Sequence, residues 1–219
     1  MNFFVTGTDT DVGKTFFTVL LIRSLRSAGI DAVGYKPVAC GGWEDVDALV
    51  AAADEVEPRA AVCPVHLPMP ASPLTAAWAH GKVLDPAAMV AGYHALASRH
   101  EMVVVEGAGG WLVPITTDYF LADLATELAL PVIVVVKSRL GALNHTLLTL
   151  ESLERHGLHC AGIVLNHAGV SDDPAAHSNR ATFELLRRAP ILCELMKDQQ
   201  GFDLAPFGLP GSVSVRPAG

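Results

Sequence analysis

The strongest restriction on the fold comes from a nine-residue segment, GTDTDVGKT, at residues 7–15. A short apolar run, Phe3 to Thr6, precedes it, and a helical pattern follows from Lys14 to Ala28. A strand, a glycine-containing loop and a helix N-terminus in this order direct several backbone N–H groups to one point, where the helix dipole adds positive charge. The sequence therefore predicts a loop that holds the phosphates of MgATP.

Two residues of this segment match the side chains that a P-loop uses. Lys14 is expected to reach the outer phosphates, and the Thr15 hydroxyl is expected to bind magnesium. The loop is one residue longer than usual, because Thr8 stands where the first glycine is expected and Gly7 precedes it. The alternative is an ordinary strand-to-helix turn with a surface lysine, which the flanking strand and helix disfavour.

Apolar runs alternate with helical patterns along the rest of the chain, as in doubly wound α/β folds. We predict one P-loop α/β domain, residues 1–219, with a mostly parallel sheet of about seven strands flanked by helices. Residues 60–81 are proline-rich and are expected to be irregular, and residues 201–219 are expected to form a loop or tail. Strands are expected over 3–6, 32–36, 102–106, 132–136, 161–165 and 191–194, and helices over 14–28, 45–56, 86–98, 121–128, 143–156 and 175–188.

Composition excludes several classes of function. The chain has 219 residues, 51% of them hydrophobic, which suits one core. Its net charge of −8 and its lack of a Lys or Arg run disfavour nucleic-acid binding, and no apolar stretch approaches the roughly 18 residues of a membrane span. The four cysteines form no CxxC pair, and the N-terminus carries no secretory pattern, so we expect a cytoplasmic protein without a zinc site.

Acidic residues at strand ends are candidate magnesium ligands, because parallel sheets bind ligands at the carboxyl ends of their strands. Glu106 ends a valine-rich strand directly before the glycine-rich turn 107–110. Its alternative role is to accept hydrogen bonds from the backbone amides of that turn. Asp45 and Asp47 follow the second strand, and spacing alone does not separate them, since either could ligate the metal or cap a helix.

A second lysine, Lys36, ends the second strand and precedes Pro37. Together with Lys14 it would place two positive charges beside a substrate whose negative charge grows during reaction, which stabilises a transferring phosphoryl group. The alternative is a solvated lysine at a strand end.

Four blocks of the chain together resemble dethiobiotin synthetase. They are VTGTDTDVGKT at residues 5–15, GYKPV at 34–38, VEGAGGW at 105–111 and LGALNHT at 140–146. They occur in the order of that family over residues 1 to about 166, whereas roughly the last 50 residues resemble it weakly.

The resemblance implies an ATP-dependent ring closure in biotin synthesis, from 7,8-diaminononanoate and carbon dioxide. One amine takes up carbon dioxide as a carbamate, and a carbamate oxygen attacks the γ-phosphate to give a carbamic–phosphoric anhydride. The second amine then closes the ring and expels phosphate.

The same resemblance assigns roles to individual residues. It implies that Lys14 and Lys36 are catalytic, that Thr15, Asp47 and Glu106 bind magnesium, and that the enzyme is a homodimer. Asn166 matches the residue that reads adenine, with an amide able to donate and accept. The residues implied for nucleotide binding are Asp11, Val12, Gly13, Lys14, Thr15, Phe16, Asp47, Glu106, Gly107, Ala108, Gly109, Asn166 and His167, and those implied for the substrate are Thr10, Cys40, Gly141 and Asn144.

Several of these positions have simpler interpretations. Asn166 could be an ordinary turn residue, His167 a core or solvent-facing histidine, and Gly141 to Asn144 a plain helix start. Cys40 stands where many members carry a hydroxyl residue, and residues 192–197 lack a proline that often contacts the adenine. The missing proline leads to the hypothesis that triphosphates other than ATP are also accepted.

Two other classes of protein share the expected fold. A P-loop switch ATPase acts through partner binding, but it usually carries a second lysine early in the loop, where this chain has Thr8 and Asp9. A synthetase of the cobyric-acid amidotransferase type generally carries an additional glutaminase domain, for which the chain has no residues left.

Overall fold

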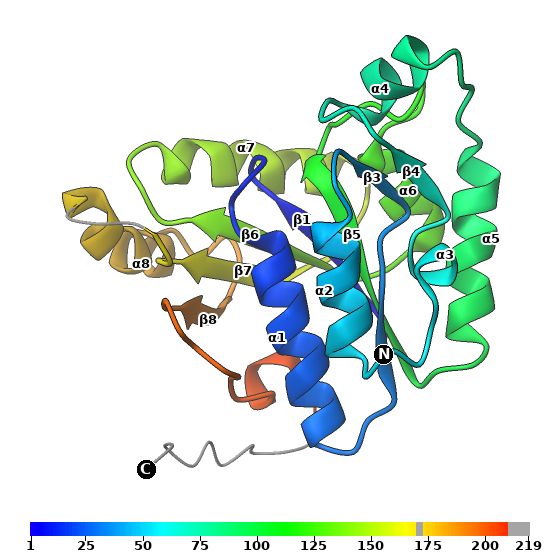
Figure 1. Cartoon of the computed structure of the whole chain (residues 1–219). Helices are drawn as coiled ribbons and strands as arrows, with labels where there is room; N and C mark the ends of the chain where they lie inside the picture. Colours follow the sequence, from blue (N-terminus) through cyan, green and yellow to red (C-terminus); the bar gives the residue numbers. More distant parts are fainter. Residues whose placement is uncertain (170–172, 210–219) are drawn as a thin grey trace.

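The computed structural model describes residues 1–169 and 173–209, and its centre is a parallel sheet (Figure 1). Six strands form it in the order β2-β5-β1-β6-β7-β8. A second sheet consists of two short parallel strands, β3 and β4. The strands are β1 (Phe3–Gly7), β2 (Ala32–Tyr35), β3 (Val38–Cys40), β4 (Val65–Leu67), β5 (Met102–Gly110), β6 (Val132–Lys137), β7 (Cys160–Asn166) and β8 (Ile191–Leu195).

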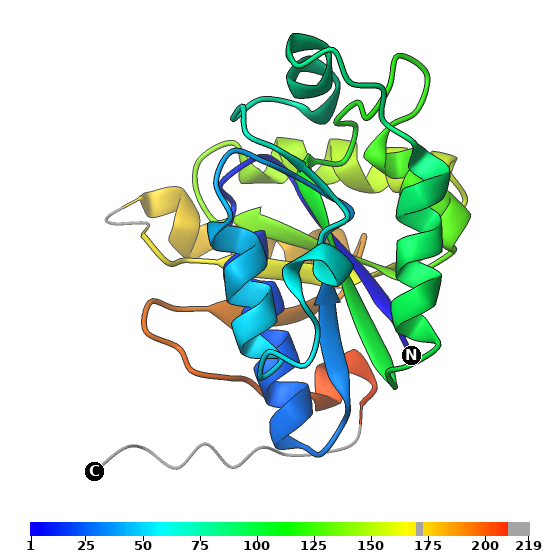
Figure 2. The same cartoon turned by 45° about the vertical axis from the view of Figure 1, so that its right-hand side comes forward.

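Helices cover both faces of the large sheet. Helices α1 and α2 pack against each other on one face, whereas α5 and α6 lie on the other (Figures 1 and 2). The helices are α1 (Lys14–Ser27), α2 (Glu44–Ala52), α3 (Arg59–Val62), α4 (Pro73–Ala79), α5 (Pro86–Ala97), α6 (Leu121–Leu128), α7 (Ala142–Arg155), α8 (Pro174–Leu186) and the 3-10 turn η1 (Ala205–Phe207). None of these described helices has the length and apolar character needed to cross a membrane.

The central strands are buried on both faces, as their valine runs predict. Val103, Val104 and Val105 of β5 are fully buried, and so is the whole run 132–136 of β6. Strand β1 lies between them and pairs in parallel with both. The predicted α/β fold is therefore confirmed, and the carboxyl ends of β1, β2 and β5 meet at one edge of the sheet.

The expectation that residues 60–81 are irregular is wrong. This segment contains the end of α3, all of β4 and all of α4. Ser72 caps α4 by accepting a hydrogen bond from the Thr75 amide, and Pro73 occupies the first helical turn. These elements are too short to show a hydrophobic period, and β4 depends on pairing with β3, so the local pattern does not reveal them.

The segment that follows β8 is loop apart from η1, and it packs against α1. Phe202, Leu204 and Phe207 are buried, and the rings of Phe202 and Phe207 stack on Phe17 with centroids 5.7 and 6.0 Å away. Residues 210–219, the rest of the predicted tail, lie outside the described residues.

Candidate active site

The loop between β1 and α1 wraps tightly around the start of the helix. Asp11 and Gly13 have positive φ values of 56° and 97°. A Cβ at Gly7 would lie 2.6 Å from a methyl group of Val12, so glycine is required where the loop folds back on the strand end. This backbone path turns successive N–H groups toward one side, as expected of an anion-binding loop.

Lys14 and Thr15, the first two residues of α1, point toward the other strand ends. The Lys14 ammonium donates to the Asp9 carbonyl at 3.1 Å and is largely buried. Burial lowers the pKa of Lys14, and the nearby Glu106 carboxylate opposes that shift. The Thr15 hydroxyl donates to Glu106 Oε1 at 2.7 Å, so helix α1 and strand β5 are joined inside the site.

Glu106 is fully buried, and its two carboxylate oxygens differ. Oε1 accepts from the Thr15 hydroxyl at 2.7 Å and from the Lys36 ammonium at 2.6 Å, whereas Oε2 has no hydrogen-bond partner in the described structure. In the described structure Glu106 accepts no hydrogen bond from the backbone amides of the glycine-rich turn, which was its alternative role. A buried oxygen without a partner is costly, so its position fits a cation that supplies the missing contact.

Lys36 lies between two carboxylates. Its ammonium is 2.5 Å from Asp45 Oδ2 and 2.6 Å from Glu106 Oε1, and only 5% of its side chain is exposed. Burial alone would lower the pKa of Lys36, but the two carboxylates outweigh burial and raise it above its usual value. Lys36 is therefore a buried cation beside the phosphate loop, and its burial excludes the alternative of a solvated lysine.

The structure brings Asp45, and not Asp47, into the site. Asp47 pairs with Arg59 at the molecular surface and does not line the cavity. Burial would raise the pKa of Asp45, but Lys36 and, more weakly, the Thr15 hydroxyl lower it. Successive helical residues are about 100° apart, so positions 45 and 47 of α2 point in nearly opposite directions and only one of them faces Lys36. Asp45 therefore replaces Asp47 as the candidate acid.

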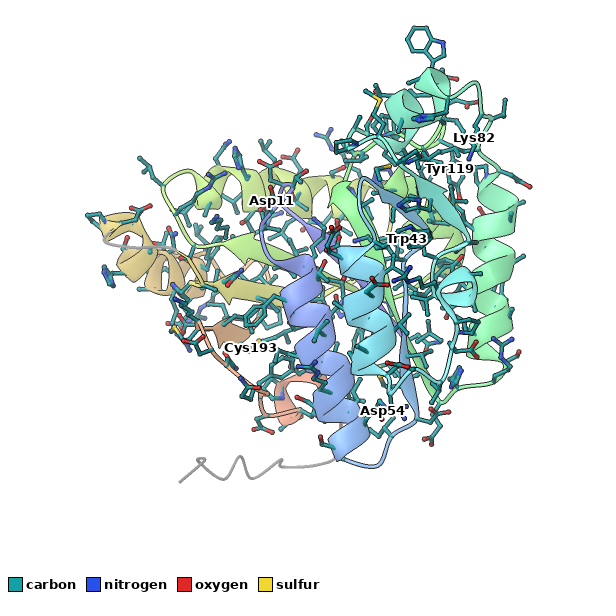
Figure 3. All side chains as sticks on the ribbon, in the orientation of Figure 1. Asp11, Trp43, Asp54, Lys82, Tyr119 and Cys193 are labelled. Atoms are coloured by element: carbon teal, nitrogen blue, oxygen red, sulfur yellow. The ribbon has the colours of Figure 1, made fainter. Side chains whose placement is uncertain are left out.

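An aromatic stack holds the start of α2 in place. The Trp43 and His66 rings are parallel with centroids 3.9 Å apart, and the Arg59 guanidinium lies over Trp43. His66 also contacts the Gly41 carbonyl at 2.8 Å. Figure 3 labels Trp43 above α2 and Asp11 above α1, at the same end of the two helices. The stack thus fixes the loop that positions Asp45.

A cavity of about 760 Å³ opens where these groups meet. Most of the predicted phosphate-loop residues line it, together with Lys36 and Cys40. Burial raises the pKa of the Cys40 thiol, and Lys36 opposes the shift. The predicted residues on the wall are Thr10, Asp11, Gly13, Lys14, Thr15, Phe16, Lys36, Cys40, Ala108 and Gly109, together with Asp45, which the sequence left open beside Asp47. The residues not predicted are Pro70, Ala71, Ser72, Pro73 and Val113. The SP pair at 72–73 is a helix-start signal that could have drawn attention to this wall.

Other predicted residues lie away from the cavity. Asn166 contacts the Val12 carbonyl, and the His167 ring pairs with Glu194 at 2.9 Å. Gly141 and Asn144 are exposed at the start of α7 and line no part of the cavity. Val12 and Gly107 are packed behind the wall, the latter beside the Phe4 ring.

Comparison with known proteins bears directly on this site. The family described as the AAA domain matches residues 1–200. The ATP-dependent dethiobiotin synthetase of Anaeromyxobacter dehalogenans strain 2CP-1 is 49% identical over 193 residues, which are 86% of this chain and 86% of that protein. That of Akkermansia muciniphila is 43% identical over 203 residues, 93% of this chain and 95% of that protein. The chain belongs to the dethiobiotin synthetase family. The prediction of an ATP-dependent dethiobiotin synthetase, made from four sequence blocks, is thereby confirmed.

Several solved structures share only the fold with this chain. The septum site-determining protein MinD from Pyrococcus horikoshii superposes with a TM-score of 0.58 at 17% identity, covering 90% of this chain and 82% of that one. The cell division protein FtsY from Thermotoga maritima gives 0.57 at 17% identity, covering 94% of this chain and 66% of that one. Identity this low shows a shared P-loop architecture, so the likeness to MinD does not favour the switch-ATPase alternative over dethiobiotin synthetase.

Proposed function

We propose that the cavity beside the phosphate loop converts 7,8-diaminononanoate, carbon dioxide and ATP into dethiobiotin, ADP and phosphate. The observation that carries this proposal is the buried contact of Lys36 with Glu106 and Asp45, directly beside Lys14. A reaction that joins a carbamate to the γ-phosphate brings two anions together, and the two lysines on the cavity wall supply positive charge that compensates them.

The acidic residues fit a magnesium ion that arrives with the nucleotide. We assign Thr15, Asp45 and Glu106 as its protein contacts, because the Thr15 hydroxyl contacts both carboxylates and the second oxygen of Glu106 is buried without a partner among the described residues. Among the described residues, no group of three or more His, Cys, Asp and Glu side chains is arranged to hold a metal ion, so phosphate oxygens would complete the coordination. When bound, magnesium would neutralise part of the triphosphate charge.

The chain's own groups would then act in sequence. The loop N–H groups and Lys14 hold the γ-phosphate, and Lys36 holds the carbamate formed on one amine. The carbamate oxygen attacks the γ-phosphorus, and ADP leaves. The second amine attacks the carbamate carbon of the resulting anhydride and releases phosphate. Lys36 compensates charge in this scheme and is not a nucleophile, because its ammonium is held between two carboxylates.

The far wall of the cavity would hold the diamine. Residues 70–73 and Cys40 provide a mostly apolar surface for its carbon chain. A second copy of the chain would bring the helix start at Gly141 and Asn144 to the carboxylate. Surface leucines around that helix support a homodimer, since Leu140 is 81% exposed and Leu148 58% exposed.

The reaction assay separates a synthetase from a switch ATPase. Purified protein is given MgATP and bicarbonate, with or without diaminononanoate, and ADP is followed over time. We expect ADP release only when the diamine is present. Steady ADP release without it would overturn the synthetase assignment.

A Lys36→Gln variant tests the role of Lys36 in the same assay. The glutamine keeps the length of much of the side chain but removes the charge that faces the carbamate. We expect nearly unchanged ATP binding and a decrease in diamine-dependent turnover on the order of a hundredfold. Turnover close to that of the wild type would remove Lys36 from the reaction.

A further inference from the structure

The Asn166 side chain joins two parts of the chain that lie 154 residues apart. It stands at the carboxyl end of β7 and is 4% exposed. Its Nδ2 donates to the Val12 carbonyl at 2.8 Å, and its Oδ1 accepts from the Ala168 amide at 2.9 Å. One end of the amide thus holds the phosphate loop, and the other end holds the loop that follows β7.

The Val12 carbonyl lies between two residues with unusual backbone conformations. The residues on either side of it, Asp11 and Gly13, both adopt left-handed backbone conformations, which are unfavourable for aspartate. A Cβ at Gly13 would lie 2.1 Å from Asn166 Nδ2, so the amide is packed directly against the loop backbone. Only glycine, which has no side chain, can occupy position 13 while this contact exists.

Asn166 itself is held rigidly. Its backbone pairs with Lys137 of β6 and with Leu195 of β8, so it lies in the interior of the sheet and not in a free loop. Its carbonyl also accepts from the Ser138 amide at 2.9 Å. The sheet therefore fixes one end of the contact, and the unusual conformation of the phosphate loop lies at the other.

We propose that Asn166 is a positioning residue for the phosphate loop. By holding the Val12 carbonyl it keeps the N–H groups of residues 13–15 aimed at the phosphates before the nucleotide arrives. This role contributes to phosphate binding whatever base the nucleotide carries. Among the described residues, one N–H and one lone pair of the amide have no partner, so reading a base remains compatible with this role.

The test uses a ligand with no base. Binding of magnesium tripolyphosphate and of MgATP is measured by calorimetry on the wild type and on Asn166→Asp, whose second oxygen would oppose the Val12 carbonyl. We expect tripolyphosphate affinity to fall about tenfold or more, and the KM for ATP to rise by a similar factor while the KM for the diamine is unchanged. Unchanged tripolyphosphate affinity with weaker ATP binding would overturn the proposal, because Asn166 would then act on the base alone.

Asn2→Asp is the matched control. Asn2 also makes one donor contact, to the Tyr93 hydroxyl at 2.7 Å, and accepts one backbone N–H, from Val103 at 2.8 Å, at the other end of the sheet. We expect it to leave tripolyphosphate affinity unchanged. An equal loss in both variants would show general destabilisation and would contradict a local role for Asn166.

A second measurement needs no ligand and no reaction. Hydrogen exchange of the amides of residues 13–15 is compared between the ligand-free wild type and Asn166→Ala, which also serves if the aspartate variant does not fold. Faster exchange confined to this loop supports the positioning role, and unchanged exchange overturns it. The inference rests on the proposed function only for the identity of the nucleotide. If the synthetase assay failed, tripolyphosphate binding and hydrogen exchange would therefore still test the role of Asn166.

Discussion

At the scale of single residues, one buried cation organises the active site. Lys36 contacts Glu106, which is fully buried, and Asp45, whose side chain is 53% exposed. Removing charges from water is costly, and mutual attraction offsets the cost only when the geometry is good. Lys36, Glu106 and Asp45 hold one another in place, so the charges that face the reacting phosphate need little reorganisation.

Two neighbouring aspartates give a test at this scale. Asp45→Asn removes a carboxylate beside Thr15 and Lys36, so the magnesium concentration for half-maximal activity should rise about tenfold or more, equivalent to about 1.4 kcal/mol. Asp47→Asn removes only a surface pair with Arg59 and should change this concentration less than about twofold. Titration of activity with magnesium measures both. A larger effect at Asp47 would restore the assignment that the family resemblance favoured.

At the scale of elements, a close approach between α5 and β2 holds one face of the sheet. Tyr35 of β2 is fully buried, and its hydroxyl donates to the Met89 carbonyl at 2.5 Å. A Cβ at Gly92 would lie 2.5 Å from that hydroxyl, so the helix can approach the strand only because position 92 has no side chain. The distance between α5 and β2 therefore depends on Gly92 and Tyr35.

Substitution of Gly92 tests that approach. Alanine favours a helix over glycine by about 1 kcal/mol, but the added methyl group would clash with Tyr35. We expect Gly92→Ala to destabilise the protein by about 1–3 kcal/mol in urea unfolding. Adding Tyr35→Phe, which removes the clashing oxygen, should recover most of the loss.

Ala95→Gly, on the exposed side of α5, is the control for helix propensity. It should cost about 1 kcal/mol, and Tyr35→Phe should not rescue it. If Tyr35→Phe failed to rescue Gly92→Ala, the hydroxyl would not be the group that limits the approach.

At the scale of the whole molecule, the two ends of the sheet have different tasks. The carboxyl ends of the strands carry the cavity, whereas an ionic network ties the connections at the amino ends. The His100 ring contacts Asp31 and Glu57 with both nitrogens at 2.9 Å, and Arg99 also donates to Glu57 at 2.8 Å. Asp54, labelled at this lower end in Figure 3, pairs with Arg26. The network joins the segments that lead into β2, α3 and β5.

The network predicts a pH-dependent contribution to stability. Burial would raise the pKa of Glu57, but His100 and Arg99 lower it. A carboxyl with a lowered folded-state pKa stabilises the protein above its unfolded value, near 4.3, and loses this contribution as pH falls further. Glu57→Gln should therefore cost about 1–2 kcal/mol in urea unfolding at pH 7 and much less at pH 3.

Glu151→Gln, at an exposed helix pair with Arg155, is the control and should have almost no effect at either pH. A loss at Glu57 of the same size at pH 3 and pH 7 would mean that the carboxylate charge is not what stabilises the network.

The sequence by itself determined the layered fold and the main charged groups of the site. Runs such as Val132 to Val136 favour strands buried on both faces of a parallel sheet. A strand followed by a glycine loop and Lys14 favours a phosphate-binding turn over an ordinary one. Lys36 and Glu106 follow from the same logic, because strand ends converge at one edge of the sheet. All of these signals come from residues that are close together in the sequence, so the local pattern is enough to predict them.

The tertiary structure decided the features for which the local sequence pattern offers two equal choices or gives no signal. Asp45 and Asp47 flank the buried Val46 about 100° to either side, so the apolar face of α2 is the same for both, and only the position of the helix relative to Lys36 selects Asp45. Strand β4 exists because β3 pairs with it, and the contact between Asn166 and Val12 spans 154 residues. Contacts of this kind form only when the chain has folded, since no sequence pattern connects the two partners.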